Sequence, residues 1–324
     1  MYIQTAPDRV VVHAPAKLNL FLEVLARRPD GFHEIETLMT AINLCDTLIA
    51  TPRSDGQITL QCVWASGADQ RDISAAASSP ARGRSLESLP DPTKNIVVRA
   101  LTLLQQRAAV SHGLDVQLVK RIPAAAGLGG ASSDAAAALI AANHAWGLDL
   151  PLNELSAIAA ELGSDIPFFF SNGSAVCRGR GERIEPIEAP RLHVVVVRPP
   201  EGLSTPEVYR HCRPAESPAS SLPLREALAQ GNTRKAARLM LNRLQEPAAR
   251  LSGWIVRLQS EFDRLDCVGH QMSGSGSSYF GICHHARHAR RTAARLRARG
   301  LGSVHAAATA RWAVTQGQPD GAKR

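Results

Sequence analysis

One segment constrains this chain of 324 residues more than any other, a run of small residues at positions 122–134. It reads Ile-Pro-Ala-Ala-Ala-Gly-Leu-Gly-Gly-Ala-Ser-Ser-Asp and precedes an alanine-rich stretch of helical type. Small residues let the backbone approach a ligand, and glycine adopts the positive φ angles that turn successive N–H groups inward. Ser132 and Ser133 come where the helix begins, at its unpaired N–H groups. The segment therefore predicts a polyphosphate site.

The segment differs from the common nucleotide motifs. It lacks the lysine of a GK[ST] Walker A loop, and Ser132 stands where GxGxxG requires its last glycine. A flexible turn, capped by serine before a packed helix, would have the same glycine content. On glycine content alone, both interpretations stay open.

The rest of the chain alternates short apolar runs with amphipathic stretches. We expect strands at 10–13, 18–24, 47–51, 58–63, 114–120, 192–198 and 279–283. We expect helices at 96–108, 134–145 and 153–162, the last of which ends at Gly163. Residues 65–91 are rich in Ser, Ala, Pro, Arg and Gly without periodicity, which predicts an inserted surface loop.

The net charge of +8 suits either a nucleic-acid surface or an anionic small substrate. Much of the excess lies in the arginines between Arg287 and Arg299, which alternate with apolar residues at helical spacing. No aromatic residue interleaves with them, as a surface for single strands would require. We expect an exposed helix face and no nucleic-acid partner.

Cysteine usage and the N-terminus indicate the compartment. The six cysteines form no CxxC pair, which argues against a zinc ribbon or a disulfide framework, and we expect each to be a small buried hydrophobic residue. The sequence begins without a signal-peptide pattern and contains no apolar run long enough to cross a membrane. We expect a cytoplasmic protein with no membrane partner. His284 and His285 adjoin each other without further ligands, so no metal site is predicted.

Two further motifs accompany the central segment. Residues 14–22 read Ala-Pro-Ala-Lys-Leu-Asn-Leu-Phe-Leu, and residues 272–278 read Met-Ser-Gly-Ser-Gly-Ser-Ser. Together the three resemble, in the same order, the motifs of the galactokinase, homoserine kinase and mevalonate kinase (GHMP) superfamily, with Ala131 as the one departure in the central glycine cluster. The resemblance implies an α+β protein of two lobes. Residues 1–188 would resemble domain 2 of ribosomal protein S5, and residues 189–324 would be ferredoxin-like.

The resemblance also implies ATP as the phosphoryl donor. Mg2+ would arrive with the nucleotide and neutralise phosphate oxygens. The hydroxyl of Ser132 or Ser133 would be available as a protein ligand of the ion. Asn95 and Lys120 fall where relatives contact the adenine and the phosphates, although a loop asparagine and an edge-strand lysine are plain alternatives. The implied ATP-binding residues are Asn95, Lys120, Pro123, Ala124, Ala125, Ala126, Gly127, Leu128, Gly129, Gly130, Ala131, Ser132, Ser133, Gly274, Ser275 and Gly276.

Within the superfamily, the chain closely resembles the 4-diphosphocytidyl-2-C-methyl-D-erythritol kinases. The matching stretches are Arg-Pro-Asp-Gly-Phe-His at 28–33, Thr-Leu-Met at 37–39 and Leu-Gly-Ser-Asp-Ile-Pro-Phe-Phe at 162–169. That family phosphorylates the 2-hydroxyl of its substrate in the non-mevalonate route to isoprenoid precursors. A kinase for mevalonate or homoserine, and a protein that senses ATP and sugar without catalysis, are the alternatives.

The resemblance assigns the catalytic roles to two residues. Asp165 would be the general base, and Lys17 its cationic partner near the phosphoryl group. We expect Lys17 to keep Asp165 ionised, because opposite charges favour one another's charged forms. A surface lysine and a turn aspartate are the simpler interpretations of each residue in isolation. Asn19 would position the acceptor, with a strand-end hydrogen bond as its competing role.

The acceptor residues are assigned in the same way. Phe32 and His33 match an aromatic–histidine pair that recognises cytosine, by stacking and by hydrogen bonds to its pairing edge. Thr205, Pro206 and Tyr209 resemble the segment that closes the other side, with Tyr209 as a second ring. The expected partner is a small cytidine-diphosphate-linked polyol, and the protein would be a monomer or a homodimer.

Overall fold

Two long paired strands form the centre of the larger sheet. In this computed structural model, which describes residues 1–65 and 95–310, β2 (Arg9–Arg27) runs antiparallel to β3 (His33–Arg53) over most of its length. The prediction of separate strands at 10–13 and 18–24 is wrong. Register shifts, one of them between Pro15 and Ala16, absorb the proline, so that a single strand continues through it.

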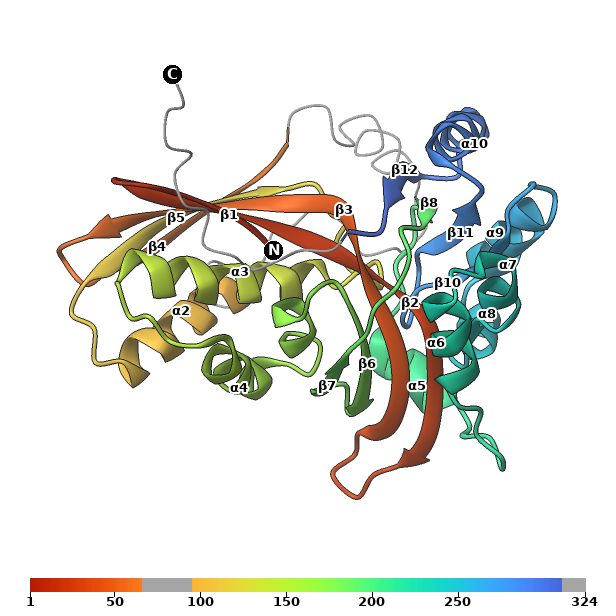
Figure 1. Ribbon diagram of the computed structural model, residues 1–324, viewed down its shortest axis with the longest axis horizontal. Coiled ribbons are helices and arrows are strands. Elements are labelled where there is room, and N and C mark those ends of the chain that lie inside the picture. The colour runs from red at the N-terminus through yellow and green to blue at the C-terminus, as the bar shows by residue number, and fades with distance from the viewer. Residues whose placement is uncertain (66–94, 311–324) are drawn as a thin grey trace.

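The larger sheet carries helices on one face. Its main order is β1 (Tyr2–Ala6), β2, β3, β5 (Gly113–Lys120) and β4 (Ile58–Trp64). Further pairs add β6 (Ser174–Gly179) to β3, β7 (Arg183–Pro186) to β6, and β9 (Leu241–Asn242) to β2. The covering helices, seen in Figure 1, are α2 (Ile96–Arg107), α3 (Gly130–Ala145) and α4 (Leu152–Leu162). The short 3-10 helix η2 (Pro167–Phe170) packs against α3 and α4.

These helices agree with the sequence, except at one boundary. α3 begins at Gly130 rather than at Asp134, because the glycines that end the loop already take part in the first helical turn. α4 ends at Gly163 as predicted, although Gly163 is extended, with φ 179°. Of the predicted insertion at 65–91, only Ala65 lies within the described residues.

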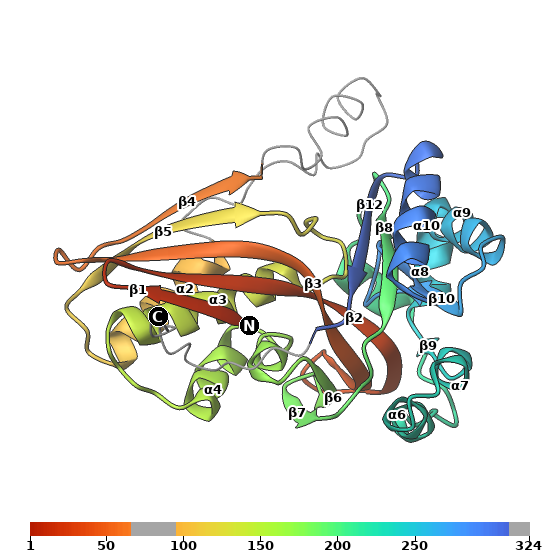
Figure 2. The ribbon, with the colours of Figure 1, turned by 45° about the horizontal axis from the view of Figure 1, so that its top comes forward.

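The second sheet is antiparallel throughout. Its order is β10 (Gly269–Met272), β11 (Tyr279–Cys283), β8 (His193–Arg198) and β12 (Ser303–Ala308). The helices of this half are α5 (Thr205–His211), α6 (Leu222–Ala229), α7 (Thr233–Arg238), α8 (Gln245–Leu251), α9 (Gly253–Asp263) and α10 (Ala286–Ala298). Figure 2 shows α8, α9 and α10 on the side of this sheet that faces away from the larger one.

Two sheets with their own helices confirm the predicted α+β fold with two lobes. The predicted boundary at 188 and 189 falls between β7 and β8 and stays a prediction. In α10, Ala289, Ala293 and Leu296 are buried and the arginines are exposed, so the expected exposed helix face is confirmed.

Two other expectations can be compared with the described residues. All six cysteines are free, but Cys45, Cys62 and Cys267 are only half-buried, so the expectation of six buried residues is partly wrong. Within residues 1–65 and 95–310, no helix is long and apolar enough to cross a membrane.

Candidate active site

Lys17 and Asp165 meet where the three motifs converge. Lys17 lies in β2 and is buried, whereas the Asp165 side chain, just before η2, is 39% exposed. Lys17 Nζ is 3.8 Å from Asp165 Oδ2. Burial lowers the pKa of Lys17, and the charge of Asp165 opposes that shift. A carboxylate that is open to an incoming alcohol and backed by a buried ammonium suits general-base catalysis.

Asn19 connects this pair to the body of β2. Its Oδ1 accepts a hydrogen bond of 2.6 Å from Lys17 Nζ, and its Nδ2 donates to Thr37 Oγ1 at 2.8 Å. Thr37 Oγ1 in turn donates to the Phe21 carbonyl at 2.6 Å. This buried chain fixes the orientation of the Asn19 amide, so the direction of the Lys17 ammonium is set before any ligand arrives.

The glycine loop (residues 123–134) curves tightly after β5 and continues into the first turns of α3. Ala125, Gly127 and Gly129 have φ of 49°, 72° and 69°. A Cβ added to Gly127 would lie 2.2 Å from the Ser273 carbonyl oxygen, and one at Gly129 would lie 2.9 Å from Lys17 Cγ. Glycine is therefore needed at 127 and 129 for its positive φ and also because neighbouring chain segments approach closely.

The third-motif turn (residues 273–278) lies directly against the glycine loop. Ser273 Oγ donates to the Gly127 carbonyl at 3.1 Å, and the Ser278 N–H donates to the Ala126 carbonyl at 3.1 Å. A Cβ added to Gly274 would be 3.2 Å from Lys17 Nζ. The three motifs, which are far apart in sequence, thus surround the ammonium of Lys17.

The glycine loop has the properties that a polyphosphate requires. Gly129 caps α3, whose first N–H groups have no intrahelical partner and whose positive dipole end faces the loop. The hydroxyls of Ser133, Ser277 and Ser278 are buried and have no hydrogen-bond partner in the part of the chain that the structure describes. Buried hydroxyls normally have partners, and a phosphate with its counter-ion would supply them. Ala131, the departure from the superfamily pattern, is exposed.

Lys120 is held by two buried carboxylates at the base of the loop. Its Nζ donates to Asp46 and, at 2.5 Å, to Asp134. Asp46 also accepts the backbone N–H groups of Arg121 and Ile122. Burial would lower the pKa of Lys120, but the charges of Asp134 and Asp46 outweigh it and raise this pKa to about 12. Burial raises the pKa of Asp134 in turn. These contacts join β3, β5 and α3 behind the glycine loop.

Asn95 caps α2, because its Oδ1 accepts the Val97 N–H at 2.9 Å. Asn95 thus has a local structural role, in line with the loop asparagine that the sequence left open. The edge-strand alternative for Lys120 is wrong, because β5 lies between β3 and β4 and Lys120 is buried. Contact of either residue with a nucleotide stays a prediction.

The predicted acceptor residues come together from three elements. Phe32, in the turn between β2 and β3, is 54% exposed, and the Arg180 guanidinium lies 5.1 Å from its ring centroid. The rings of His33 and Tyr209 are 5.1 Å apart, which joins β3 to α5. Burial and the nearby charge of Arg27 lower the pKa of His33, which favours the neutral imidazole. A neutral imidazole offers one donor and one acceptor.

Thr205 and Pro206 open α5, in the segment predicted to close the acceptor pocket. Thr205 Oγ1 lies 2.7 Å from Ser275 Oγ, so α5 is joined to the third-motif turn.

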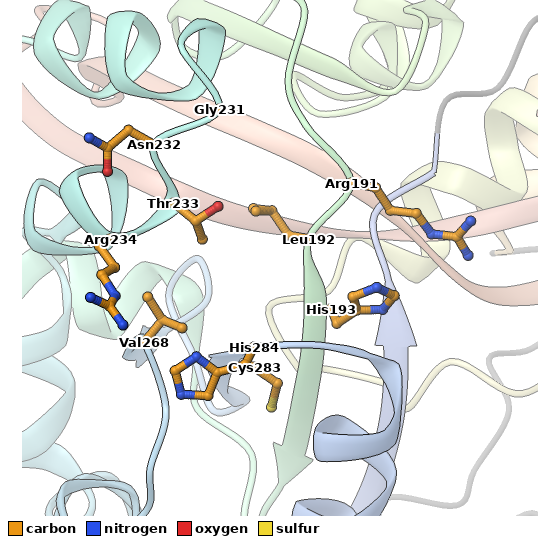
Figure 3. A pocket seen from close by; sticks show the side chains of 10 residues that line it. All are labelled: Arg191, Leu192, His193, Gly231, Asn232, Thr233, Arg234, Val268, Cys283 and His284. Carbon is orange, nitrogen blue, oxygen red and sulfur yellow. The ribbon is translucent and has the colours of Figure 1, made fainter.

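A separate cavity of about 350 Å³ lies at the other end of the second sheet (Figure 3). β10 and β11 reach the third-motif turn at Met272 and Tyr279, whereas the cavity is at their opposite ends, by Val268 and Cys283. None of the predicted site residues lines it. The convergence of the motifs, and not this cavity, defines the candidate site.

The sequence-based prediction omitted four buried residues that support the site: Thr37, Asp46, Asp134 and Asn242. Asp46 carried a signal, since an aspartate within the apolar run at 44–49 is costly to bury unless it is paired. Asp134 belonged to the quoted glycine segment but was given no role. Thr37 belonged to the matching stretch at 37–39 but was given no role, and Asn242 shows no pattern in the sequence that would have singled it out.

Comparison with known proteins agrees with this geometry. The family model for the GHMP kinases N terminal domain matches residues 95–173, and the model for the GHMP kinases C terminal matches residues 224–301. The L. major mevalonate kinase, solved in complex with R-mevalonate, shares the fold with a TM-score of 0.64 at 16% identity, over 96% of this chain and 98% of that one. The fold and the converging motifs are those of a GHMP kinase.

More similar proteins narrow the class. A relative from Pelotomaculum thermopropionicum, named 4-diphosphocytidyl-2-C-methyl-D-erythritol kinase, is 38% identical over 88% of this chain and 92% of its own length. A relative of the same name from Rhodopirellula baltica is 40% identical over 87% of this chain and 89% of its own length. A crystal structure of 4-(cytidine 5'-diphospho)-2C-methyl-D-erythritol kinase matches with a TM-score of 0.75 and 34% identity, over 93% of this chain and 99% of that one. The chain belongs to the 4-diphosphocytidyl-2-C-methyl-D-erythritol kinase family.

Proposed function

We propose that this protein transfers the γ-phosphoryl group of ATP to the 2-hydroxyl of 4-diphosphocytidyl-2-C-methyl-D-erythritol, giving the 2-phosphate and ADP. The observation that carries the proposal is the Lys17–Asp165 pair, 3.8 Å apart, beside both glycine turns. The names of the relatives at 38% and 40% identity supply the acceptor. The product belongs to the non-mevalonate route to isoprenoid precursors.

In this reaction the oxygen of the acceptor hydroxyl bonds to the γ-phosphorus, and ADP leaves. Asp165 accepts the proton of that hydroxyl at the same time. Lys17 offsets the negative charge that gathers at the phosphoryl group, and its burial strengthens this effect because little water screens it. Asn19 keeps the ammonium directed through the hydrogen bond at its Oδ1. Lys17 and Asn19 are held in place before substrates bind, which lowers the cost of reaching the transition state.

The phosphates of ATP would lie between the glycine loop and the third-motif turn, against backbone N–H groups. Mg2+ bound with the nucleotide would neutralise the negative charge of the phosphates. The buried hydroxyl of Ser133, which has no partner among the described residues, is the protein group best suited to that ion. Asn95 would lie on the adenine side. We propose that Lys120 acts on the phosphates through the loop that it supports.

The acceptor would bind on the opposite side of Lys17. Phe32 offers an exposed ring for stacking on cytosine, and neutral His33 offers a donor and an acceptor to the base. Tyr209, with Thr205 and Pro206 at the start of α5, would close the pocket. A cytosine-reading pair serves no purpose for mevalonate or homoserine, which is why these acceptors are the weaker candidates.

We also propose that the protein acts in the cytoplasm as a monomer or homodimer and without nucleic acid. Its free cysteines suit a reducing compartment, and its arginines lie on the exposed face of α10 without interleaved aromatic residues. Retention of a fluorescent duplex at physiological salt would contradict the absence of a nucleic-acid partner.

The direct test incubates purified protein with ATP, Mg2+ and 4-diphosphocytidyl-2-C-methyl-D-erythritol and follows ADP release with a coupled assay. Mevalonate and homoserine serve as control acceptors at equal concentration. We expect ADP release with the cytidine-linked acceptor alone. Equal release with mevalonate, or none with any acceptor, would overturn the proposal.

A further inference from the structure

Asn242 lies outside all three motifs, in the short strand β9 that pairs with β2. Only 8% of this residue is exposed, so its amide must find partners inside the protein. Nδ2 donates to the carbonyl oxygens of Met272 at 2.8 Å and Gly274 at 2.9 Å, and Oδ1 accepts the Leu244 N–H at 3.0 Å. Asparagine has two N–H donors, and both serve the third-motif turn and the residue before it.

The backbone that Asn242 holds lies against the ammonium of Lys17. A Cβ on Gly274 would be 3.2 Å from Lys17 Nζ and 3.4 Å from Asn19 Oδ1. Gly274 has a φ of 57°, so the turn bends sharply at this point of contact. A shift of the turn by an ångström would either press on the ammonium or leave a gap beside it.

The segment around Asn242, residues 241–245, is itself bonded to β2, the strand that carries Lys17. The Arg243 N–H donates to the Leu22 carbonyl at 2.8 Å, and the Arg243 guanidinium makes two hydrogen bonds, of 2.6 and 2.7 Å, to the buried carboxylate of Glu23. Gln245 Oε1 accepts the Met272 N–H at 2.8 Å. Residues 241–245 therefore tie the third-motif turn to β2 from outside the active site.

We propose that Asn242 is a positioning residue for phosphoryl transfer, which sets the distance between the third-motif turn and Lys17. The inference rests on the proposed function and adds a residue to its machinery. Misplacement by about 1 Å, caused far from the chemistry, costs about 100-fold in rate in enzymes generally. An asparagine with a structural role alone would stabilise the fold without affecting turnover.

The test compares Asn242→Asp with a matched control, Asn143→Asp. Asn242→Asp keeps the side-chain size, removes both donors and turns carboxylate oxygens toward two carbonyls. Asn143 is 9% exposed, and its amide bonds both the carbonyl and the N–H of Leu150 at 3.0 Å. It lies about 20 Å along α3 from Gly130, at 1.5 Å per residue. Both variants lose buried hydrogen bonds, but only Asn242 lies beside the candidate active site.

We expect kcat of Asn242→Asp to fall about 100-fold and its affinity for a non-hydrolysable ATP analogue to fall about tenfold. Asn143→Asp should lose thermal stability while both quantities stay within about threefold of wild type. If Asn242→Asp also stays within that range, the inference is wrong. If it fails to fold, Gln245→Met takes its place and must meet the same thresholds for kcat and ATP-analogue affinity. This variant removes the acceptor for the Met272 N–H and the side-chain hydrogen bond to Tyr279.

Failure of the proposed function would look different. Wild-type protein would then release no ADP with the cytidine-linked acceptor. In that case the affinity for the ATP analogue decides the inference alone, because it needs no acceptor. Equal affinity in Asn242→Asp and wild type would then refute the positioning role.

Discussion

On the loop side of Lys17, polar groups are buried and bonded to one another, whereas the aromatic side exposes the Phe32 ring and leaves His33 and Tyr209 half-buried. The loop side (residues 123–134 and 273–278) has Lys120 fixed between two carboxylates and Ser273 bonded to the Gly127 carbonyl. The aromatic side (Phe32, His33 and Tyr209) has an exposed ring and one ring pair. We infer that the loop side is shaped by folding itself and that the aromatic side is completed by its ligand.

This difference has a consequence for substitutions. On the loop side a change removes interactions that also hold the fold, so stability and nucleotide affinity should fall together. On the aromatic side a change removes contacts that only a ligand would complete, so binding should fall while stability is kept. Asp165 lies between the loop side and the aromatic side, and its substitution should affect turnover alone.

Asp165→Asn should have the largest effect, because it removes the proton acceptor while the shape stays the same. General-base catalysis contributes up to about 10⁴-fold, so we expect kcat to fall by about 10³- to 10⁴-fold. Thermal stability and ATP affinity should stay close to wild type, since the Asp165 side chain is 39% exposed. Steady-state kinetics and calorimetry measure both quantities, with the exposed Asp8→Asn as the control. Wild-type turnover in Asp165→Asn would refute its role as the base.

Lys120→Met should cause the next largest effect, in stability. It leaves the carboxylates of Asp46 and Asp134 buried without their cation, and breaking a buried pair in this way costs about 3–5 kcal/mol. Denaturant unfolding measures the loss, and the exposed Lys235→Met is the control. If Lys120→Met lost ATP affinity but no stability, Lys120 would contact the nucleotide directly and the loop side would be less rigid than we infer.

Gly127→Ala tests the close approach of the two glycine turns. The added Cβ would lie 2.2 Å from the Ser273 carbonyl oxygen, and alanine is strained at a φ of 72°. Gly147→Ala is the matched control, because Gly147 has a φ of 62° but nothing within 4 Å of its Cβ position. Strain at positive φ costs both variants about 1–2 kcal/mol, and only Gly127→Ala should also raise KM for ATP. Equal KM values in the two variants would contradict the packing argument.

The sequence predicted the parts of the site that lie within short motifs. The glycine loop was predicted from its own residues, and Lys17 and Asp165 were predicted from the resemblance of their motifs to a known family. The structure brings Lys17 to within 3.8 Å of Asp165. The sequence did not predict the buried residues that support the site, because their contacts join positions that are far apart in the chain. Asp46 reaches Lys120 across 74 positions, and Asn242 reaches Gly274 across 32. No local periodicity records such contacts, and the continuity of β2 through Pro15 was missed since its bulge depends on β3.

Phe32→Ala should have the smallest effect and is the sharpest test of the comparison. An aromatic stack is worth about 0.5–1.5 kcal/mol, so KM for the cytidine-linked acceptor should rise about 2- to 12-fold with kcat unchanged. Stability should stay the same, as it should in Leu222→Ala, because both side chains are 54% exposed. Phe32→Tyr keeps the ring and should keep KM. If Phe32→Ala instead lowered the melting temperature, its contact with Arg180 would be part of the fold, and the aromatic side would be shaped in advance like the loop side.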